Sequence, residues 1–545
     1  MKAEPAGPFG PLIRAIGAWR CLADPLDRLT PLGWRGGLIF TLAFSLVSFL
    51  VSGYFLVYWR NADMDFMVVY SALALNDGHR GAFFDHPAYL TILSVKTWLR
   101  LLHDAHLLDA WTLSSIPPAS NGPAFDAAMT AAIRAGRIIA LLTAGGLLCA
   151  FAALARRMVA DRRIATCGVV AFGLSGGLQM HLRVLRSEMI AAGFCILAMM
   201  LLIVVARRGT AWRPFAIAVA AWLCVLGLEN KVQAILLIAA LPMLVLPFGT
   251  VAGASIPFWR SGLPAALITA ALAVAAACAA MLAWPLIATG LDPATAAAAG
   301  LRPLMFGRFG VYQAILVGWT FACMVSFAMV WRVSPLETVA AIASLVIGAS
   351  LGLLMLYVQY DVADVVVVLN PIEKMSMYVE ASESAASLAN TFSLALSGLT
   401  GVLARYSFVL MSSPRPAVFL TWLIFPGIVY VWRRGRHHAA AQAAILMLAA
   451  LAIDAIGVRR GLKIEYFVFT DPLIIIAGMI LLDELKGVRF HRWTFPIGAA
   501  LIVLHVTIGQ AEPVKLLLKR NGPQSICAWS PTYLPALPLP WCERI

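Results

Sequence analysis

The sequence predicts an all-α integral membrane protein with about 13 transmembrane helices. Hydrophobic residues make up 61% of the 545 residues and charged residues 12%, whereas soluble proteins contain roughly 45–50% and about 25% of these classes. The mean hydropathy is +0.85. A soluble globule cannot hide this much apolar surface, so most of it must face lipid or other helices. A disordered chain is excluded for the same reason.

Apolar segments of about 17–25 residues are long enough to cross the hydrocarbon core of a bilayer. The predicted spans are 36–58, 132–155, 164–181, 189–206, 213–228, 233–249, 263–288, 311–331, 336–358, 417–432, 439–456, 464–482 and 494–510. The segments 164–181 and 213–228 are short for a span. A further apolar segment, 391–412, is interrupted by Gly398, Gly401 and Arg405, so we interpret it as a re-entrant or surface helix.

Basic residues in short loops predict the orientation, because cytoplasmic loops are enriched in Lys and Arg. The polar segment 1–35 is basic, so we expect it in the cytoplasm with the first helix as an uncleaved anchor. An odd number of spans then places the tail, 511–545, outside. The loops assigned to the cytoplasm contain the arginines 156, 157, 162, 163, 207, 208, 213, 433, 434 and 436. These loops explain the net charge of +14 without a nucleic-acid partner.

Between these ends, residues 36–510 are expected to form one polytopic membrane domain. It has two long outer loops, 59–131 and 359–416. The first contains WLRLLHDAHLLDAW, in which leucines recur near helical spacing. This pattern is typical of amphipathic helices that lie on the membrane surface.

The most informative stretch follows the first span, where Asp63 and Asp65 lie within two helical turns of the predicted outer surface. A carboxylate at that surface is suitable as a general base; the alternative is an idle, solvated loop. MDFMVVYSA resembles the "D-F-x-V-x-Y-x-A" stretch of GT-C glycosyltransferases in the polyprenyl-phosphate mannosyltransferase group. DHPAYLTIL resembles their "Y/H-P-P-L" segment, with Ala88 in place of the second proline. The resemblance implies Asp65 as the catalytic base, Asp63 as the second candidate, and Tyr70 and His86 near the substrate.

Two further segments place charges at the predicted outer ends of helices. Arg186-Ser187-Glu188 resembles the "R-x-D/E" of the same enzymes, and an arginine there can bind a phosphate through several hydrogen bonds. The alternative is an ion pair that anchors a helix end. Glu229 and Lys231 lie between two spans, where charges are costly and tend to be functional. A plain outer turn is the alternative.

The late segment VRRGLKIEYFVFTDPLIIIA resembles the "R/K-x-x-x-Y-x-x-P-x-x-P" helix entry of these enzymes, although Asp471-Pro472 replaces its second half. A basic cluster at the outer face departs from the usual charge asymmetry. Binding a lipid phosphate would explain it, and so would anchoring to anionic lipid headgroups. The candidate substrate-binding residues here are Arg459, Arg460, Lys463 and Tyr466, with Glu465 between them.

The resemblance implies an inverting glycosyltransferase in the bacterial inner membrane. It would transfer a monosaccharide from a polyprenyl-phosphate carrier to a lipid, glycan or protein acceptor on the periplasmic face. Basic residues would stabilise the leaving phosphate. Asp65→Asn should abolish transfer, because it removes the expected base. It should have little effect on stability, because Asp65 is expected to meet water. The alternatives are a secondary transporter or lipid flippase, and a glycan ligase that uses a polyprenyl-pyrophosphate carrier.

No cofactor is required by this chemistry, and no residue is assigned as a metal ligand. Two carboxylates with His86 could hold a divalent cation, but we expect no obligatory metal. Only two of the nine cysteines, Cys527 and Cys542, fall in segments predicted outside, where disulfides persist. They flank a proline-rich stretch, and we predict that they form a disulfide; two free thiols are the alternative.

Overall fold

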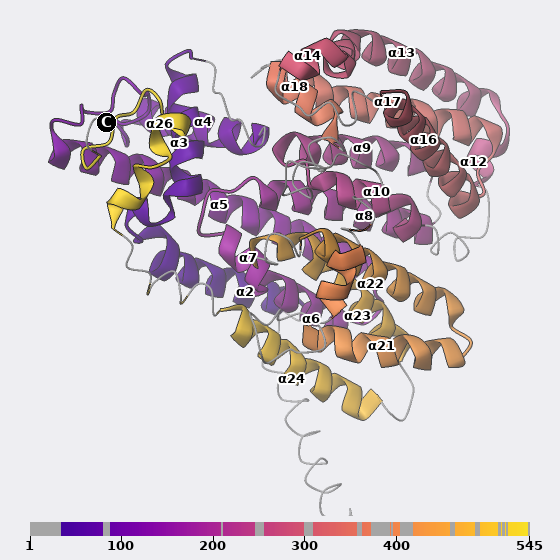
Figure 1. Cartoon of the computed structure of the whole chain (residues 1–545). Coiled ribbons are helices and arrows are strands. Elements are labelled where there is room, and N and C mark those ends of the chain that lie inside the picture. The colour runs from indigo at the N-terminus through magenta and orange to yellow at the C-terminus, as the bar shows by residue number, and fades with distance from the viewer. Residues whose placement is uncertain are drawn as a thin grey trace, which may run out of the picture.

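The computed structural model describes residues 34–79, 88–208, 211–245, 256–298, 309–356, 362–371, 393, 396–403, 418–457, 464–485, 491–510, 514, 518 and 522–542. Within these ranges every regular element is a helix. The long helices lie side by side in an elongated bundle, and the C-terminal tail lies beside α3 at one end of it (Figure 1).

The first half of the bundle is built from ten α-helical, π-helical and 3-10 elements. These are α2 (Trp34–Phe49), the π-helix η1 (Leu50–Tyr54), η2 (Tyr58–Asn61), α3 (Ala62–Asn76), α4 (Tyr89–Asp104), α5 (Gly122–Met158), α6 (Arg162–Gly173), α7 (Gly176–His181), α8 (Glu188–Arg208) and α9 (Arg213–Asn230).

The second half continues the bundle and ends in the tail. Its elements are α10 (Ala234–Val245), α12 (Pro257–Arg260), α13 (Leu263–Leu291), α14 (Pro293–Ala298), α16 (Phe309–Trp331), α17 (Pro335–Met355), α18 (Val362–Leu369), α21 (Val418–Arg433), α22 (His437–Gly457), η6 (Ile464–Tyr466), α23 (Phe467–Glu484), α24 (His491–Gly509), η7 (Pro523–Ile526) and α26 (Ser530–Tyr533).

Seven helices of the described part are long and apolar enough to cross a membrane: α2 with η1, α5, α8, α9, α13, α17 and α22. Other helices overlap the remaining predicted spans. The all-helical membrane architecture is therefore supported, whereas the number of 13 spans and the extent of the outer loops stay predictions. The segment 164–181 is two helices, because the Ser175 hydroxyl caps α7 by accepting the backbone N–H of Leu178 at 3.4 Å.

Helix α8 lies in the middle of the main core, packed between α5, α9 and α10. Helix α9 in turn packs against α17. A side chain at Gly348 of α17 would collide with the backbone carbonyl of Ala218 on α9, so glycine permits the close approach of these two helices. Small residues at such crossings are typical of helix packing in membranes.

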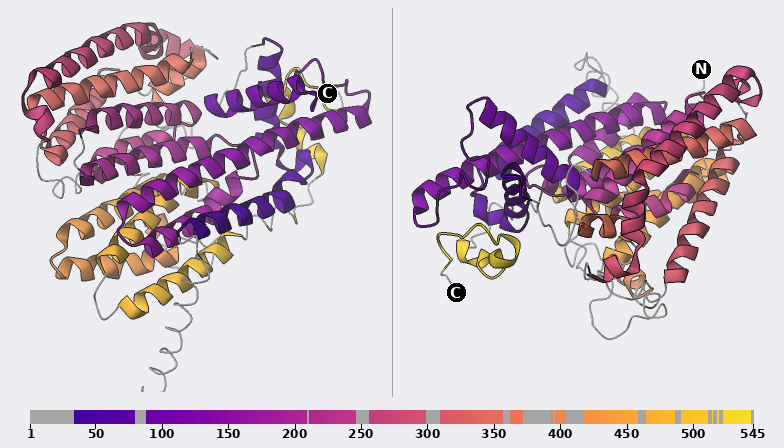
Figure 2. Two further views of the ribbon diagram at one scale, coloured as in Figure 1. Left: turned by 180° about the vertical axis from the view of Figure 1, so that it is seen from behind. Right: turned by 90° about the horizontal axis from the view of Figure 1, so that it is seen from above.

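A second core lies at the end of the bundle where the chain terminates. It joins α3, α4 and the first part of α5 to the tail residues 522–542, which bury Ile526, Leu534 and Leu539 in it. We call these four segments the tail platform; two other views show the same association (Figure 2). The ring of Trp541 lies 6.1 Å from that of Phe125 on α5. A disulfide joins Cys527 to Cys542, the pair that the sequence predicts.

Replacing both Cys527 and Cys542 with alanine is expected to loosen the packing of residues 522–542 against α3, α4 and α5. A disulfide that closes a loop of 15 residues stabilises by about 3 kcal/mol in the chain-entropy treatment. Limited proteolysis should therefore remove the tail faster from the double variant than from the parent protein. Cys149→Ala, at an exposed free cysteine, is the control. Equal rates of tail cleavage in all three proteins would contradict the prediction.

Candidate functional site

Charged side chains from three distant parts of the sequence meet next to the tail platform. Arg186 precedes α8, Lys231 follows α9, and Glu465 lies in η6. Nη1 of Arg186 is 3.0 Å from Oε2 of Glu465 and 3.8 Å from Oε1 of Glu188. Nζ of Lys231 is 2.7 Å from the same oxygen of Glu188. We call Arg186, Glu188, Lys231 and Glu465 the charged cluster.

Helix ends bring these residues together. Glu188 occupies the first turn of α8, where the helix dipole favours a negative charge. Helix α9 ends at Asn230, and the backbone N–H of Lys231 closes its last turn on Gly227 at 3.1 Å. The side-chain oxygen of Asn230 accepts the backbone N–H of Thr91 at 3.1 Å. This bond fastens the end of α9 to α4.

The charged cluster is almost completely covered. The side chains of Glu188 and Lys231 are 2% and 3% exposed, and those of Arg186 and Glu465 are 8% and 14% exposed. Burial lowers the pKa of Lys231, and the adjacent Glu188 acts in the opposite direction. Two cations face two carboxylates, so the formal charge is balanced. An anionic ligand could bind here only if the cations turned from their carboxylate partners toward it.

Two further buried groups leave hydrogen-bonding capacity: His181, next to the charged cluster, and Glu229, two residues before Lys231 in the chain. His181 holds its Nδ1 2.6 Å from the carbonyl of Gly177; because a carbonyl only accepts, Nδ1 carries the proton. Nε2 of His181 and both carboxylate oxygens of Glu229 are buried without a hydrogen-bond partner among the described residues. Burial raises the pKa of Tyr89, and Glu229 raises it further. Buried polar atoms of this kind usually meet water or a ligand.

Asp65 occupies a different environment from the one that the sequence predicts. It is 0% exposed, whereas we expected it to meet water. Its Oδ2 accepts Nε–H of Arg137 at 2.8 Å and lies 2.7 Å from Nη2 of the same guanidinium. Its Oδ1 accepts the backbone N–H of Leu185 at 2.8 Å. The expectation that Asp65 meets water is therefore wrong, and Asp65→Asn is now expected to lower stability, because the substitution would break a buried ion pair.

The remaining candidate residues are spread over several places. The hydroxyl of Tyr70 accepts the backbone N–H of Ala536 at 3.3 Å, within the tail platform. Tyr466 ends η6 beside the charged cluster. The residues outside the described part are His86, Arg459, Arg460 and Lys463, together with the side chain of Asp63, whose backbone belongs to α3.

Three further buried groups were not anticipated from the sequence: Arg137, His181 and Arg183. Arg183 donates from Nη1 to the carbonyl of Gln179 at 2.8 Å, and burial lowers its pKa to about 9. A signal was present for two of them, since HLRVLRSE places a histidine and two arginines at the end of an apolar segment. Arg137 carries a signal too, because an arginine within a predicted span is rare and costly, but nothing near it in the sequence indicates its partner.

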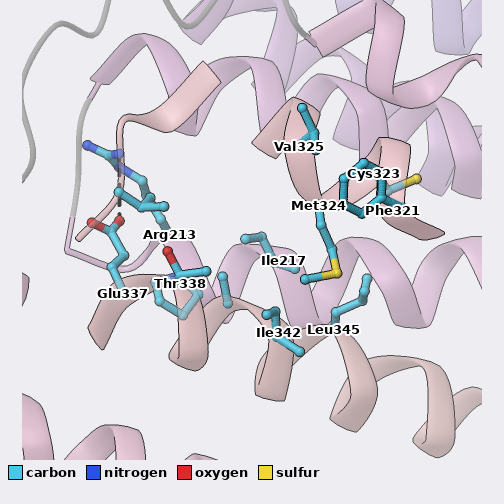
Figure 3. A pocket seen from close by; sticks show the side chains of 13 residues that line it. Arg213, Ile217, Phe321, Cys323, Met324, Val325, Glu337, Thr338, Ile342 and Leu345 are labelled. Atoms are coloured by element: carbon cyan, nitrogen blue, oxygen red, sulfur yellow. Dashed lines mark ion pairs between the residues drawn. The ribbon is translucent and has the colours of Figure 1, made fainter. Parts of the chain in front are cut away.

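A cavity of about 250 Å³ lies between α9, α16 and α17 (Figure 3). Nη1 of Arg213 and Oε1 of Glu337 are 3.6 Å apart at one side of it, and both side chains are buried. Arg213 begins α9 and Lys231 follows its end, so about 27 Å of helix separates the two places. Ser334 caps α17 by accepting the backbone N–H of Glu337 at 3.2 Å. Glu337 thus has a structural role in the first turn of α17. The described residues that line the cavity contain this single ion pair, so the charged cluster remains the stronger candidate site.

Within the described ranges, no group of three His, Cys, Asp or Glu side chains is placed to hold a metal ion. No protein-family model, curated protein or solved structure matches the chain. The function is therefore argued from the charged cluster and its surroundings.

Proposed function

We propose that the protein is a membrane glycosyltransferase whose charged cluster binds the phosphate end of a polyprenyl-phosphate sugar. One observation supports this most strongly. Charges that the sequence indicates in three separate segments, Arg186 and Glu188, Lys231, and Glu465, form one set of ion pairs in the fold. An idle set of interfacial ion pairs would not need to converge from three parts of the chain.

The proposed chemistry assigns a task to each charge. Arg186 and Lys231 bind the carrier phosphate, and they stabilise the negative charge that grows on it as the glycosidic bond breaks. Glu188 keeps both cations in place before the donor arrives. Glu229 accepts a hydrogen bond from a hydroxyl of the sugar, which gives its buried oxygens a donor.

The proton of the attacking hydroxyl goes to Asp63 in this proposal. Both oxygens of Asp65 already accept hydrogen bonds from Arg137 and Leu185, so Asp65 is poorly suited to the task. The acceptor oxygen attacks the anomeric carbon, its proton moves to Asp63, and the carrier phosphate departs with the bonding electrons. A single displacement of this kind inverts the anomeric centre.

The test uses purified protein in lipid nanodiscs with labelled polyprenyl-phosphate sugars, separated by thin-layer chromatography. We expect the label to leave the donor while free polyprenyl phosphate accumulates. A polyprenyl-pyrophosphate glycan in a parallel reaction tests for a ligase. Proteoliposomes loaded with the same donors test for movement across the bilayer without chemical change. Activity in either of these two reactions, with no turnover of polyprenyl-phosphate sugars, would contradict the proposal.

Glu229→Gln is expected to weaken donor binding without lowering stability. The substitution replaces a buried carboxyl group that has no hydrogen-bond partner in the described part, so the unfolding temperature should stay the same or rise. Losing one of the two acceptor oxygens for a sugar hydroxyl should raise the donor KM roughly tenfold. Glu337→Gln breaks an ion pair instead and should lower the unfolding temperature. An unchanged donor KM in Glu229→Gln would remove Glu229 from the site.

A further inference from the structure

The buried pair of Asp65 and Arg137 lies next to the charged cluster but is not part of it. We infer that this pair positions Arg186 through the backbone of Leu185, and thereby sets the affinity of the charged cluster for the donor phosphate. The inference rests on the proposed function. It assigns to Asp65 a role in binding, in place of the catalytic role that the resemblance implies.

The first step is the connection from Asp65 to Arg186. Residues 182–187 link α7 to α8 and are not helical, so helical hydrogen bonds do not hold their centre. The backbone N–H of Leu185 instead donates to Oδ1 of Asp65 at 2.8 Å. Arg186 is the next residue, and its guanidinium is 3.0 Å from Glu465. A shift of the Leu185 backbone would therefore move Arg186 relative to the rest of the charged cluster.

The second step is what holds Asp65 itself. The guanidinium of Arg137 binds Oδ2 of Asp65, and its Nη1 also donates to the carbonyls of Gly53 at 2.9 Å and Leu56 at 2.6 Å. These carbonyls belong to the π-helical end of the first membrane helix and the turn after it. Arg137 thus ties three elements together: α5, on which it lies, α3 and the end of η1. Both side chains of the pair are 0% exposed, and a buried network with this many hydrogen bonds is rigid.

The third step separates this role from that of a base. A carboxylate that is ion-paired with an arginine is held in its charged form and binds a proton weakly. A general base acts in the chemical step, so its loss lowers kcat by about 10²–10⁴-fold. A residue that places a phosphate-binding cation acts on donor binding first, so its loss raises KM. The kcat value falls as well, but less than on loss of a base, because the displaced cation also stabilises the leaving phosphate.

The experiment compares Asp65→Asn with Glu337→Gln in the transfer assay. Both substitutions convert the carboxylate of a buried ion pair to an amide, but Glu337, on α17, pairs with Arg213 at the other end of α9. We expect Asp65→Asn to raise the donor KM roughly tenfold to a hundredfold, with a smaller change in kcat, and Glu337→Gln to leave both constants unchanged. A fall in kcat at constant KM would identify Asp65 as the base and overturn the inference. Equal KM values in the two variants would overturn it as well.

Arg137→Lys serves if Asp65→Asn does not fold. It keeps a cation beside Asp65 but loses the fork that reaches the two carbonyls, so the donor KM should rise above that of the parent protein. A donor KM equal to that of the parent protein would contradict the positioning role of Arg137.

Hydrogen exchange tests the tether independently of any enzyme activity. Segment 182–188 should exchange faster in Asp65→Asn than in Glu337→Gln, measured by mass spectrometry of peptic fragments. If the parent protein turns over no polyprenyl-phosphate sugar, the proposed function fails while this comparison still applies. Equal exchange of the segment in the two variants would show that Asp65 does not hold Leu185.

Discussion

Asp63→Asn is expected to lower kcat for sugar transfer by two to four orders of magnitude. A general base contributes on the order of 10²–10⁴-fold, and asparagine has the same shape but cannot take the proton. Donor KM should change little, because Asp63 acts on the acceptor hydroxyl. Initial rates at saturating acceptor, with the donor concentration varied, separate kcat from KM.

Asp104→Asn is the control for this experiment, since Asp104 is an exposed carboxylate at the end of α4. It should behave as the parent protein does in both constants. A near-normal kcat in Asp63→Asn, with a large loss in Asp65→Asn, would return the role of base to Asp65. It would also contradict the positioning role proposed for that residue.

Arg137→Gln should lower the free energy of unfolding by about 3–5 kcal/mol, because it leaves Asp65 as an uncompensated buried carboxylate. This is the largest effect on stability that we expect from a single substitution in the described part. Thermal unfolding in detergent, followed by tryptophan fluorescence, measures the change. The apparent unfolding temperature should fall clearly below that of Tyr58→Phe, which loses only the hydrogen bond from Tyr58 to Asp126.

Adding Asp65→Asn to Arg137→Gln should restore part of the lost stability. The double variant replaces an ion pair by two neutral amides, so no buried charge lacks its partner. A double-mutant cycle then reports a large coupling energy between the two positions. Simple additivity of the two single effects would show that the ion pair contributes little to the fold.

The helices could be predicted from the sequence because the length of an apolar segment is a local property. Helices overlap all of the predicted spans in the described part. The interruption at Ser175 was missed, since both α6 and α7 are apolar and only a capping hydroxyl separates them. The burial of α3 was missed as well, although the run from Phe66 to Leu75 is almost entirely apolar. It was read as an outer loop because it follows the first span.

The candidate site was partly predictable as well, because the position of a charge beside an apolar segment is also a local property. Arg186, Glu188 and Lys231 stand out because charges beside apolar segments are rare, and rarity is visible in one sequence. Their pairing is not visible there. Asp65 and Arg137 are 72 residues apart, and no local pattern reports that two distant side chains meet. The role of Asp65 was therefore inferred from its neighbours in sequence, whereas its chemistry depends on its neighbours in space.

Helix α5 is 37 residues long, about 55 Å at 1.5 Å per residue, and nearly twice the roughly 30 Å of a bilayer's hydrocarbon core. Phe125 in its first turn carries the tail, and Arg137 lies 12 residues further along, about 18 Å down the same rod. A helix without a proline between these two positions bends little. Helix α5 therefore connects the tail to Arg137 through one straight helix. A displacement of its first turn would also displace Arg137, and through Asp65 the segment that carries Arg186.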